Sequence, residues 1–301
     1  MLFLPPFPRG LLLVWRALPM LLALLTASLA QAQTATPNTA ALPSFIEEVP
    51  FVTTPDNVTL EMLSAAQVGP ADHVIDLGSG DGRIVILAAK RFGASGLGVE
   101  IVPDLVAESQ RHAQAAGVAH RVTFREQDLF QTDLSAATVI TMYLLPDVNL
   151  QLRPLLLALK PGTRVVSHDW DMGDWVPDRT RVVPVPDKKL GLEKSSKVHL
   201  WVVPAQVQGL WCGAGLLGRF SLSITQQYQN FTATLADARR NRSRTLQGRI
   251  QGPQLLTDTT RQGPLTLALE GQTLRIAAAQ GDLALAIGQG FTRASGDRCT
   301  P

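Results

Sequence analysis

Residues 74–83 read V-I-D-L-G-S-G-D-G-R, and this stretch decides how the rest of the sequence is interpreted. A short apolar strand, residues 73–77, runs into a turn with glycine at every second position, and an apolar helical pattern follows from Ile84. Backbone N–H groups and the N-terminus of the helix therefore converge on one point, an arrangement typical of nucleotide-binding sites.

The residues around these glycines separate two kinds of nucleotide. The dinucleotide fingerprint is G-x-G-x-x-G/A, and Arg83 stands where its third small residue belongs, which argues against an NAD-dependent oxidoreductase. Asp76 would repel a pyrophosphate but would attract the ammonium group of a ligand that carries no phosphate. We therefore expect S-adenosylmethionine as cofactor, bound at this turn by Asp76, Gly78, Ser79 and Gly80.

Two further acids follow at the ends of the next two predicted strands. Residues 96–100 read as a strand ending in Glu100, at about the 20-residue spacing from the turn at which an acid meets ribose hydroxyls. The strand at residues 121–125 leads to Asp128, which is placed to accept a hydrogen bond from an adenine amino group. Each acid alone would be a solvated strand end or a helix cap, but together and in this order they predict one cofactor cleft.

The pattern alternates between strands and helices over residues 44–203. Helices are predicted at 55–67, 83–91, 103–116 and 148–159, and strands at 73–77, 96–100, 121–125, 138–142 and 163–168, closed by an antiparallel pair at 179–186 and 196–203. Such alternation requires right-handed crossovers. The predicted fold class is α/β, a Rossmann-like doubly wound and mostly parallel sheet, with ligands at the carboxyl ends of its strands.

Four sequence pieces carry a resemblance to a known family. They are P-F-V-T-T-P at 50–55, D-L-G-S-G-D-G-R at 76–83, G-V-E at 98–100 and Y-L-L-P at 143–146. Residues 45–203 are similar to the class I (seven-strand) methyltransferases and, more narrowly, resemble the small protein-lysine methyltransferases that act on the ATP synthase c subunit and the adenine nucleotide carrier, with their bacterial relatives. The resemblance implies methyl transfer to a lysine amine of a protein substrate, with Phe51 and Thr53 over the methionine end of the cofactor. A capped helix start with a hydrophobic staple is the alternative for that segment.

The candidate catalytic residues lie after the fourth and fifth predicted strands. Tyr143 borders the cofactor and the place where a nucleophile arrives, so it would orient an amine or shield the methyl group, or else simply cover the sheet edge. Residues 168–175 contain three acids and two tryptophans, groups that attract and accept a lysine cation. His168 or Asp169 would take the proton that the lysine loses. Turns, caps and core packing are the alternative roles for these residues.

The N-terminus reads as a targeting segment. Arg9 and Arg16 precede an apolar run at residues 17–27, and A-Q-A at 30–32 offers a cleavage site. We expect residues 1–32 to be a signal peptide, or a membrane anchor if they are not cleaved, and residues 33–43 to be a flexible leader. The predicted location is therefore periplasmic or secreted, or attached to a membrane. Export conflicts with the cofactor supply, so an exported, non-catalytic ligand-binding module on the same fold is the alternative function.

The segment 204–301 predicts a small antiparallel β domain, a meander or a barrel. Apolar residues alternate around residues 220–224, 265–269, 274–276 and 283–287, separated by turn residues. The cysteines, Cys212 and Cys299, stand near its two ends and would form one disulfide in an oxidising compartment, unless they are unrelated thiols. The basic cluster at 239–244 is expected in a solvated loop between strands.

Composition limits the partners. The chain of 301 residues has a formal charge of +2 and no dense Lys/Arg run, so nothing in it requires nucleic acid. No metal site is predicted, because the cysteines supply too few ligands and the histidines are scattered.

Overall fold

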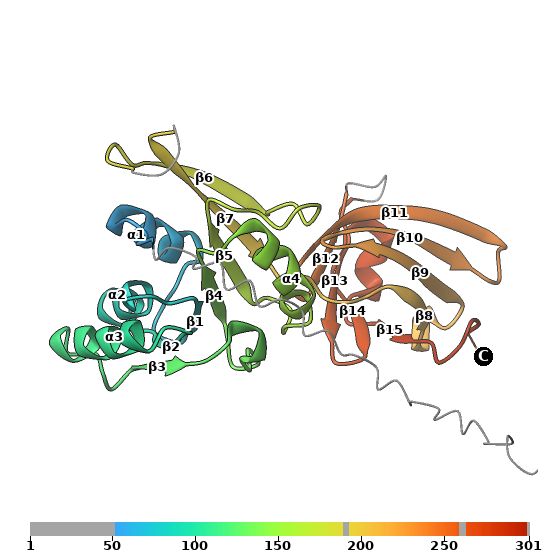
Figure 1. The fold of residues 1–301 in the computed structure, drawn as a ribbon. Coiled ribbons are helices and arrows are strands. Elements are labelled where there is room, and N and C mark those ends of the chain that lie inside the picture. The colour runs from blue at the N-terminus through green and yellow to red at the C-terminus, as the bar shows by residue number, and fades with distance from the viewer. Residues whose placement is uncertain (1–51, 189–192, 259–262, 300–301) are drawn as a thin grey trace, which may run out of the picture. The chain divides into compact units, whose positions relative to one another are not determined.

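The computed structural model describes residues 52–188, 193–258 and 263–299. Over these residues the chain forms a seven-stranded sheet with four α-helices, followed by a closed β barrel (Figure 1). Residues 50–301 group as one compact unit. The apolar run at 17–27, the leader at 33–43 and Phe51 lie outside the described residues. Within the described ranges, no helix combines the length and apolarity needed to cross a membrane.

The first part of the chain alternates strands and helices as predicted. In order, its elements are α1 (Asp56–Ala65), β1 (His73–Leu77), α2 (Arg83–Phe92), β2 (Ser95–Glu100), α3 (Pro103–Ala115), β3 (Val122–Glu126), the 3-10 helix η1 (Leu129–Gln131), β4 (Val139–Met142), α4 (Pro146–Leu157), β5 (Arg164–His168), β6 (Arg179–Pro184) and β7 (Ser195–Val202). Helix α4 begins two residues before its predicted start, because Pro146 is preorganised for the first helical position.

The strand order of the sheet is β3-β2-β1-β4-β5-β7-β6. Strands β1 to β5 pair in parallel, whereas β7 is antiparallel to both β5 and β6. The predicted α/β class and the closing antiparallel pair are thus confirmed. In this register Asp76 lies opposite Gly98 on one side and Thr141 on the other, so the ends of β1, β2 and β4 meet at one edge.

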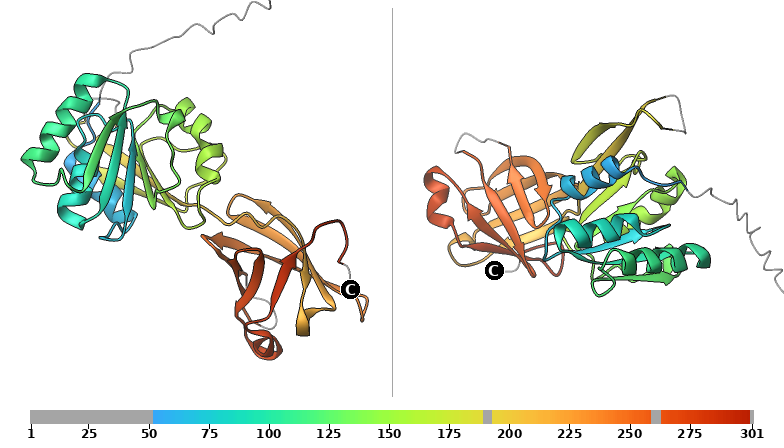
Figure 2. Two further views of the ribbon diagram at one scale, coloured as in Figure 1. Left: turned by 90° about the horizontal axis from the view of Figure 1, so that it is seen from below. Right: turned by 90° about the vertical axis from the view of Figure 1, so that its left-hand side faces the viewer.

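Alternation along the strands gives the sheet two apolar faces. Val74 and Val139 belong to the core beneath α1 and α2. Their neighbours Ile75 and Ile140 belong to the core beneath α4. Figure 2, left, shows the strands between these two sets of helices. Each fully buried aliphatic side chain of this kind contributes about 1.5–3 kcal/mol, so the two cores together hold the strand ends in place.

The second part of the chain is a closed barrel of eight strands in the order β10-β11-β12-β13-β14-β15-β8-β9. Its elements are β8 (Gly209–Gly213), the 3-10 helix η2 (Gly215–Leu217), β9 (Phe220–Gln227), β10 (Asn230–Asp237), β11 (Arg242–Gln251), β12 (Gln254–Thr257), β13 (Thr266–Glu270), β14 (Thr273–Ala278), the 3-10 helix η3 (Gly281–Ala286) and β15 (Gly290–Arg293). Inward side chains such as Trp211, Leu222 and Leu274 fill its interior. Closure leaves the barrel without an unpaired edge strand.

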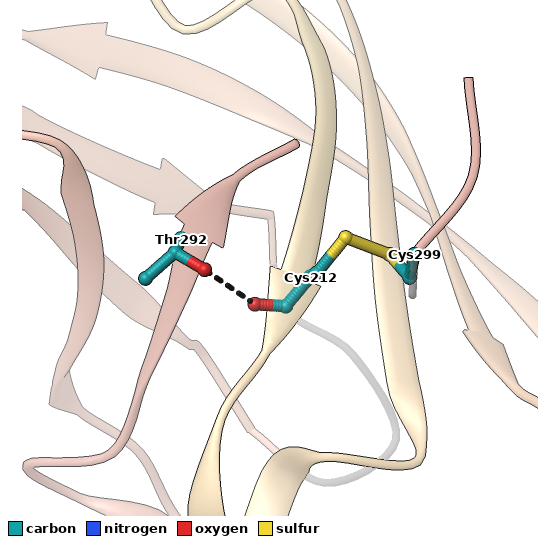
Figure 3. Close-up of a disulfide and its surroundings, with 3 residues drawn as sticks. All are labelled: Cys212, Thr292 and Cys299. Atoms are coloured by element: carbon teal, nitrogen blue, oxygen red, sulfur yellow. Dashed lines mark hydrogen bonds between the residues drawn. A yellow bond between two sulfur atoms is a disulfide. The ribbon is translucent and has the colours of Figure 1, made fainter. Parts of the chain in front are cut away.

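The predicted disulfide between Cys212 and Cys299 is present (Figure 3). It joins β8 to the segment that follows β15. The hydroxyl of Thr292 on β15 also donates to the carbonyl of Cys212, at 3.5 Å (Figure 3). The last strand of the barrel is therefore tied to β8 both covalently and by pairing.

One predicted strand is wrong. The alternation at residues 283–287 predicted a strand, but the structure has the 3-10 helix η3 there, connecting β14 to β15. Gly281 and Gly288 bracket this connection with φ of +58° and +85°, a backbone conformation that turns the chain away from a strand path. Leu285 is consequently 85% exposed and does not enter the barrel wall.

Candidate functional site

The turn between β1 and α2 is made possible by its glycines. Gly78 and Gly82 adopt φ of +73° and +80°, a region that L side chains rarely enter. A Cβ atom on Gly78 would lie 2.9 Å from Leu144 Cδ2, and one on Gly82 would lie 2.7 Å from the Phe124 ring. The turn therefore packs closely against the ends of its neighbouring strands, and it can do so only with glycine.

Asp76 is a buried carboxyl group without a cationic partner among the described residues. It is 2% exposed, and its Oδ1 accepts a hydrogen bond of 2.7 Å from the hydroxyl of Thr141. The pKa of Asp76 is raised to about 7: burial is the main cause, the Thr141 hydrogen bond opposes it, and repulsion from Glu100 and Asp81 adds to it. A bound cation would stabilise the ionised form, so the position suits a ligand with an ammonium group.

Glu100, at the end of β2, is bonded to the same turn. Its Oε2 accepts from the backbone N–H of Gly80 at 3.0 Å. Its Oε1 accepts from the N–H groups of Ile101 and Val102 at 2.8 and 3.1 Å. The structure thus brings Glu100 and Asp76 together on the glycine turn, as expected for two acids that would hold different ends of one cofactor.

Ser79 supplies a further polar group at this turn. The residue is 6% exposed, and its hydroxyl has no hydrogen-bond partner in the described structure. A Cβ atom on Gly98 would lie 2.6 Å from this hydroxyl, so glycine at position 98 leaves the space that Ser79 occupies. A buried hydroxyl without a partner is costly, and a polar ligand at the turn would satisfy it. The residues present therefore fit S-adenosylmethionine.

Asp128 has an observed structural role besides its predicted one. It caps η1, with Oδ1 accepting from Phe130 N at 2.9 Å and Oδ2 from Gln131 Nε2 at 3.2 Å. The preceding residue, Gln127, donates its N–H to the carbonyl of Glu100 at 2.9 Å, which keeps this segment beside the end of β2. The contact between Asp128 and adenine stays a prediction.

His168, at the end of β5, is buried and held on both ring nitrogens. It is 1% exposed; Nδ1 lies 3.2 Å from Thr54 Oγ1 and Nε2 lies 2.9 Å from Ser196 Oγ. The pKa of His168 is lowered to about 4: burial is the main cause, the charge of Asp169 opposes it, and the charge of Lys188 adds to it. The ring is therefore neutral near pH 7. Because both nitrogens are engaged, this geometry favours a positioning role for His168 over the predicted role as a base.

Tyr143 stacks on the His168 ring, with centroids 3.9 Å apart and planes at 30°. Its hydroxyl forms no hydrogen bond with any described residue. Burial raises the pKa of Tyr143, and the charge of Asp169 adds to this effect, so the hydroxyl remains protonated at neutral pH. Tyr143 therefore offers a hydroxyl just after β4 that the described residues leave available, and its place beside the acceptor stays a prediction.

Both carboxylate oxygens of Asp169 contact other residues of the protein. Its Oδ2 pairs with Lys188 Nζ at 2.7 Å, and its Oδ1 accepts from Lys197 N at 2.8 Å. Burial raises the pKa of Asp169, but these contacts lower it by more, so the pKa lies below its usual value. The residue adopts φ of +61°, which turns the chain sharply after β5. Trp170 follows it and is 44% exposed, with Asp171 beside it on the surface.

The segment before α1 is linked to the turn through contacts that the sequence did not predict. Arg83 pairs with Asp81 through Nη2 and Oδ2 at 2.6 Å, and its Nη1 donates to the carbonyl of Thr54 at 2.9 Å. Thr53 itself is exposed, and Phe51 lies outside the described residues. The sequence predicted neither the Asp81–Arg83 pair nor a role for Thr54, Thr141 or Ser196 in the site.

Comparison with known proteins gives the following matches. Residues 76–179 match the family model described as the ANTKMT methyltransferase domain. A protein-lysine N-methyltransferase of Saccharolobus islandicus is 41% identical over 162 residues, which make up 53% of this chain and 97% of that protein. A Xenopus laevis lysine N-methyltransferase, named for the c subunit of ATP synthase, is 36% identical over 131 residues, 43% of this chain and 56% of that protein.

Among solved structures, an RNA methyltransferase from Salinibacter ruber in complex with S-adenosyl-L-homocysteine is similar. It shares 52% sequence identity, covers 52% of this chain and 96% of its own, and superposes with a TM-score of 0.47. The family-model match ends at residue 179, before the barrel begins at Gly209.

Proposed function

Because this chain belongs to the S-adenosylmethionine-dependent methyltransferase family of the archaeal protein-lysine N-methyltransferase, we propose that it methylates the side-chain amine of a lysine in a protein substrate. The observation that carries this proposal is the extent of the match, 97% of the archaeal enzyme at 41% identity. The substrates named for the vertebrate relatives belong to those proteins, so the identity of the methylated protein is left to experiment.

In this proposal three groups hold the cofactor. Asp76 binds the ammonium group of the cofactor and Glu100 binds its ribose hydroxyls. The Ser79 hydroxyl forms a hydrogen bond with a polar group of the same ligand. When bound, S-adenosylmethionine supplies a methyl group that its sulfonium has already activated. The protein then has to position the amine in line with that methyl group and exclude water, which together account for most of the acceleration needed.

On the acceptor side, the residues after β4 and β5 guide the lysine. Asp171 and Trp170 are exposed there, and a carboxylate beside an aromatic face attracts a primary ammonium. The amine must lose its proton to solvent water before it attacks, and the Tyr143 hydroxyl orients the neutral amine by accepting a hydrogen bond from it. His168, held between Thr54 and Ser196, fixes the ring of Tyr143 by stacking on it.

Two measurements test this function. Calorimetry on a 33–301 fragment should detect S-adenosylmethionine binding that Asp76→Ala or Glu100→Ala abolishes, and unchanged binding in both variants would remove the cofactor assignment. Transfer of labelled methyl groups to a cell extract, followed by acid hydrolysis, should yield methylated lysine. Label recovered in nucleic acid instead would overturn the choice of acceptor, and cofactor binding without any transfer would favour the non-catalytic binding module.

For the location, we propose that the domain lies on an oxidising side of a membrane, reached through the apolar N-terminal segment. The support is the Cys212–Cys299 disulfide, because such bonds persist in oxidising compartments and are rare in reducing ones. This disulfide favours export over an anchored domain that faces the cytoplasm. It also requires that S-adenosylmethionine be supplied outside.

A reporter fused after Pro301 and thiol alkylation in intact cells test the location together. A reporter active only in the exported state, with both cysteines protected from alkylation, is the expected result. A cytoplasmic reporter signal with alkylated cysteines would contradict it.

A further inference from the structure

One end of the barrel carries apolar side chains that its fold leaves uncovered. Leu216 in η2 is 74% exposed, and Leu285 in η3 is 85% exposed, with Ile287 just after η3 at 48%. Among the described barrel residues, these are the large apolar side chains on the surface. Single exposed leucines are common, but three that all lie in the connections between strands form a pattern that the barrel core does not explain.

The pairing of the strands places these three residues at the same end. Helix η2 follows β8, and η3 precedes β15. Gly213 at the end of β8 pairs with Phe291 at the start of β15, and Ala214 N donates to Gly290 O at 3.1 Å. Both 3-10 helices therefore extend from one rim of the barrel.

The basic tip of the β10–β11 hairpin lies on this rim as well. Asp237, the last residue of β10, pairs with Phe220, the first residue of β9, just after η2. Ala238 N donates to Arg219 O at 3.0 Å. Residues 239–241 of the basic cluster form a turn as predicted, whereas Arg242 and Arg244 belong to β11, so the predicted loop is wrong for that half. The cluster thus lies at the tip of a hairpin on the same rim as η2 and η3.

Three arginines of this tip, Arg239, Arg240 and Arg242, have no counter-charge among the described residues. Arg239, Arg240 and Arg242 are exposed, and their side chains form no ion pair or hydrogen bond with the residues that the structure describes. Asp237 does not neutralise them, because it is 9% exposed and its carboxylate is occupied by Arg219 at 3.4 Å and by the backbone N–H groups of the hairpin tip.

We propose that this end of the barrel docks on a lipid surface that carries anionic headgroups. Its contact surface, here named the barrel rim, consists of Leu216, Leu285, Ile287, Arg239, Arg240 and Arg242. The aliphatic side chains enter the boundary between headgroups and acyl chains, and the arginines bind headgroup phosphates. Aliphatic rather than aromatic side chains accompany the arginines, which fits lipid better than the stacked bases of a nucleic acid. This binding is independent of methyl transfer.

Vesicle binding of a 33–301 protein tests the proposal. Residues 50–301 group as one compact unit, so this protein keeps the contacts described here. It lacks the apolar run at 17–27, which would bind vesicles by itself. We expect it to bind vesicles of phosphatidylcholine and phosphatidylglycerol in a two-to-one ratio, and to bind vesicles of phosphatidylcholine alone far more weakly. Added salt should weaken the binding.

Two variants test the arginines and the leucines of the barrel rim separately. Replacing Arg239, Arg240 and Arg242 by Gln should weaken binding about a hundredfold, since each arginine near an anionic surface contributes about fivefold. Leu216→Ser with Leu285→Ser should weaken it at least about tenfold through lost apolar contact. Matched controls remove as many cations and as many large apolar side chains elsewhere: Lys90, Arg91 and Arg111 to Gln, and Leu155 and Val182 to Ser, all exposed in the other part of the chain. The controls should bind as the parent does.

The outcomes decide the proposal either way. Loss of binding in both rim variants, with unchanged thermal unfolding and full binding by the controls, supports it. Failure of the parent to bind anionic vesicles overturns it, as does equal loss in the rim and control variants. Full binding by the leucine variant overturns the insertion of the rim into the lipid boundary.

Discussion

The sheet and the barrel each contain a buried aspartate, and the two carboxyl groups differ in whether a cation lies beside them. In the barrel, Asp237 has an arginine partner and accepts two backbone N–H groups. In the sheet, Asp76 has a single hydroxyl donor, no cation among the described residues, and two other acids that raise its pKa. A fold that satisfies its buried charges by itself needs no further partner there, whereas a buried carboxyl group without a cation takes up a proton or binds a cationic ligand. The contrast supports placing the proposed cofactor site in the sheet rather than in the barrel interior.

The largest effect should come from the barrel and should not reach the cofactor site. Replacing both Cys212 and Cys299 by Ala removes a link across 87 residues of sequence and should lower the free energy of unfolding by about 4 kcal/mol. Denaturant unfolding measures this loss, and calorimetry should find unchanged S-adenosylmethionine affinity. A parallel loss of affinity would show that the two regions are not separable.

The next largest effect is expected for the affinity of an Asp76 variant for the cofactor. Asp76→Asn should weaken S-adenosylmethionine binding about a hundredfold, because it removes the carboxylate that receives the ammonium group. The same change should stabilise the unliganded protein above pH 7, where the buried carboxyl is ionised at a cost. The matched change in the barrel, Asp237→Asn, should destabilise the protein instead. If both variants shifted the unfolding midpoint in the same direction, the contrast between the two aspartates would be lost.

The pH dependence of the parent follows from the same pKa. The pKa of Asp76 rises from 3.8 to about 7 on folding, so the folded state binds this proton more tightly than the unfolded state does. Its contribution to stability is therefore full below the unfolded value and is lost as the pH rises through about 7. Cofactor affinity should change in the opposite sense and increase over that range. Unfolding and calorimetry at several pH values measure both trends, and a flat affinity profile would exclude Asp76 as the ammonium partner.

A smaller effect is expected from replacing a glycine in the turn between β1 and α2. Gly82→Ala places a methyl group at φ of +80°, 2.7 Å from the Phe124 ring and the Ser109 Cβ, and should cost about 2 kcal/mol of stability together with cofactor affinity. Thermal unfolding and calorimetry on the same sample separate the two losses. A variant that keeps its affinity while losing stability would place Gly82 outside the cofactor cradle.

The smallest effect is expected at a barrel glycine with similar backbone geometry. Gly271, in the β13–β14 turn, has φ of +59°, and a Cβ atom there would meet nothing within 4 Å. Gly271→Ala should cost only about 1 kcal/mol, from backbone strain alone, and leave cofactor binding intact. Thermal unfolding measures this cost. A value equal to that of Gly82→Ala would show that backbone strain, rather than close packing, sets the requirement in both turns.

The sequence predicted most of the fold, because local patterns carry it. The strand ends that hold Asp76 and Glu100 were placed by the alternation of strands and helices and by the glycine turn. The antiparallel closing strands and the disulfide were also predicted and are confirmed. The segment at 283–287 was predicted as a strand because its alternation has the period of a strand, but the glycines on either side turn it into η3.

Among the site residues, the sequence alone determined which acids follow which strands, since the carboxyl ends of neighbouring parallel strands must meet at one edge. Only the tertiary structure decided what those groups contact. Thr141 is 65 residues from Asp76, and Thr54 is 114 residues from His168. Those partners come from strands and segments far apart in the chain, and their choice depends on register and packing. The two hydroxyls that contact the His168 ring nitrogens also come from distant segments, and no periodic pattern in the sequence signals them.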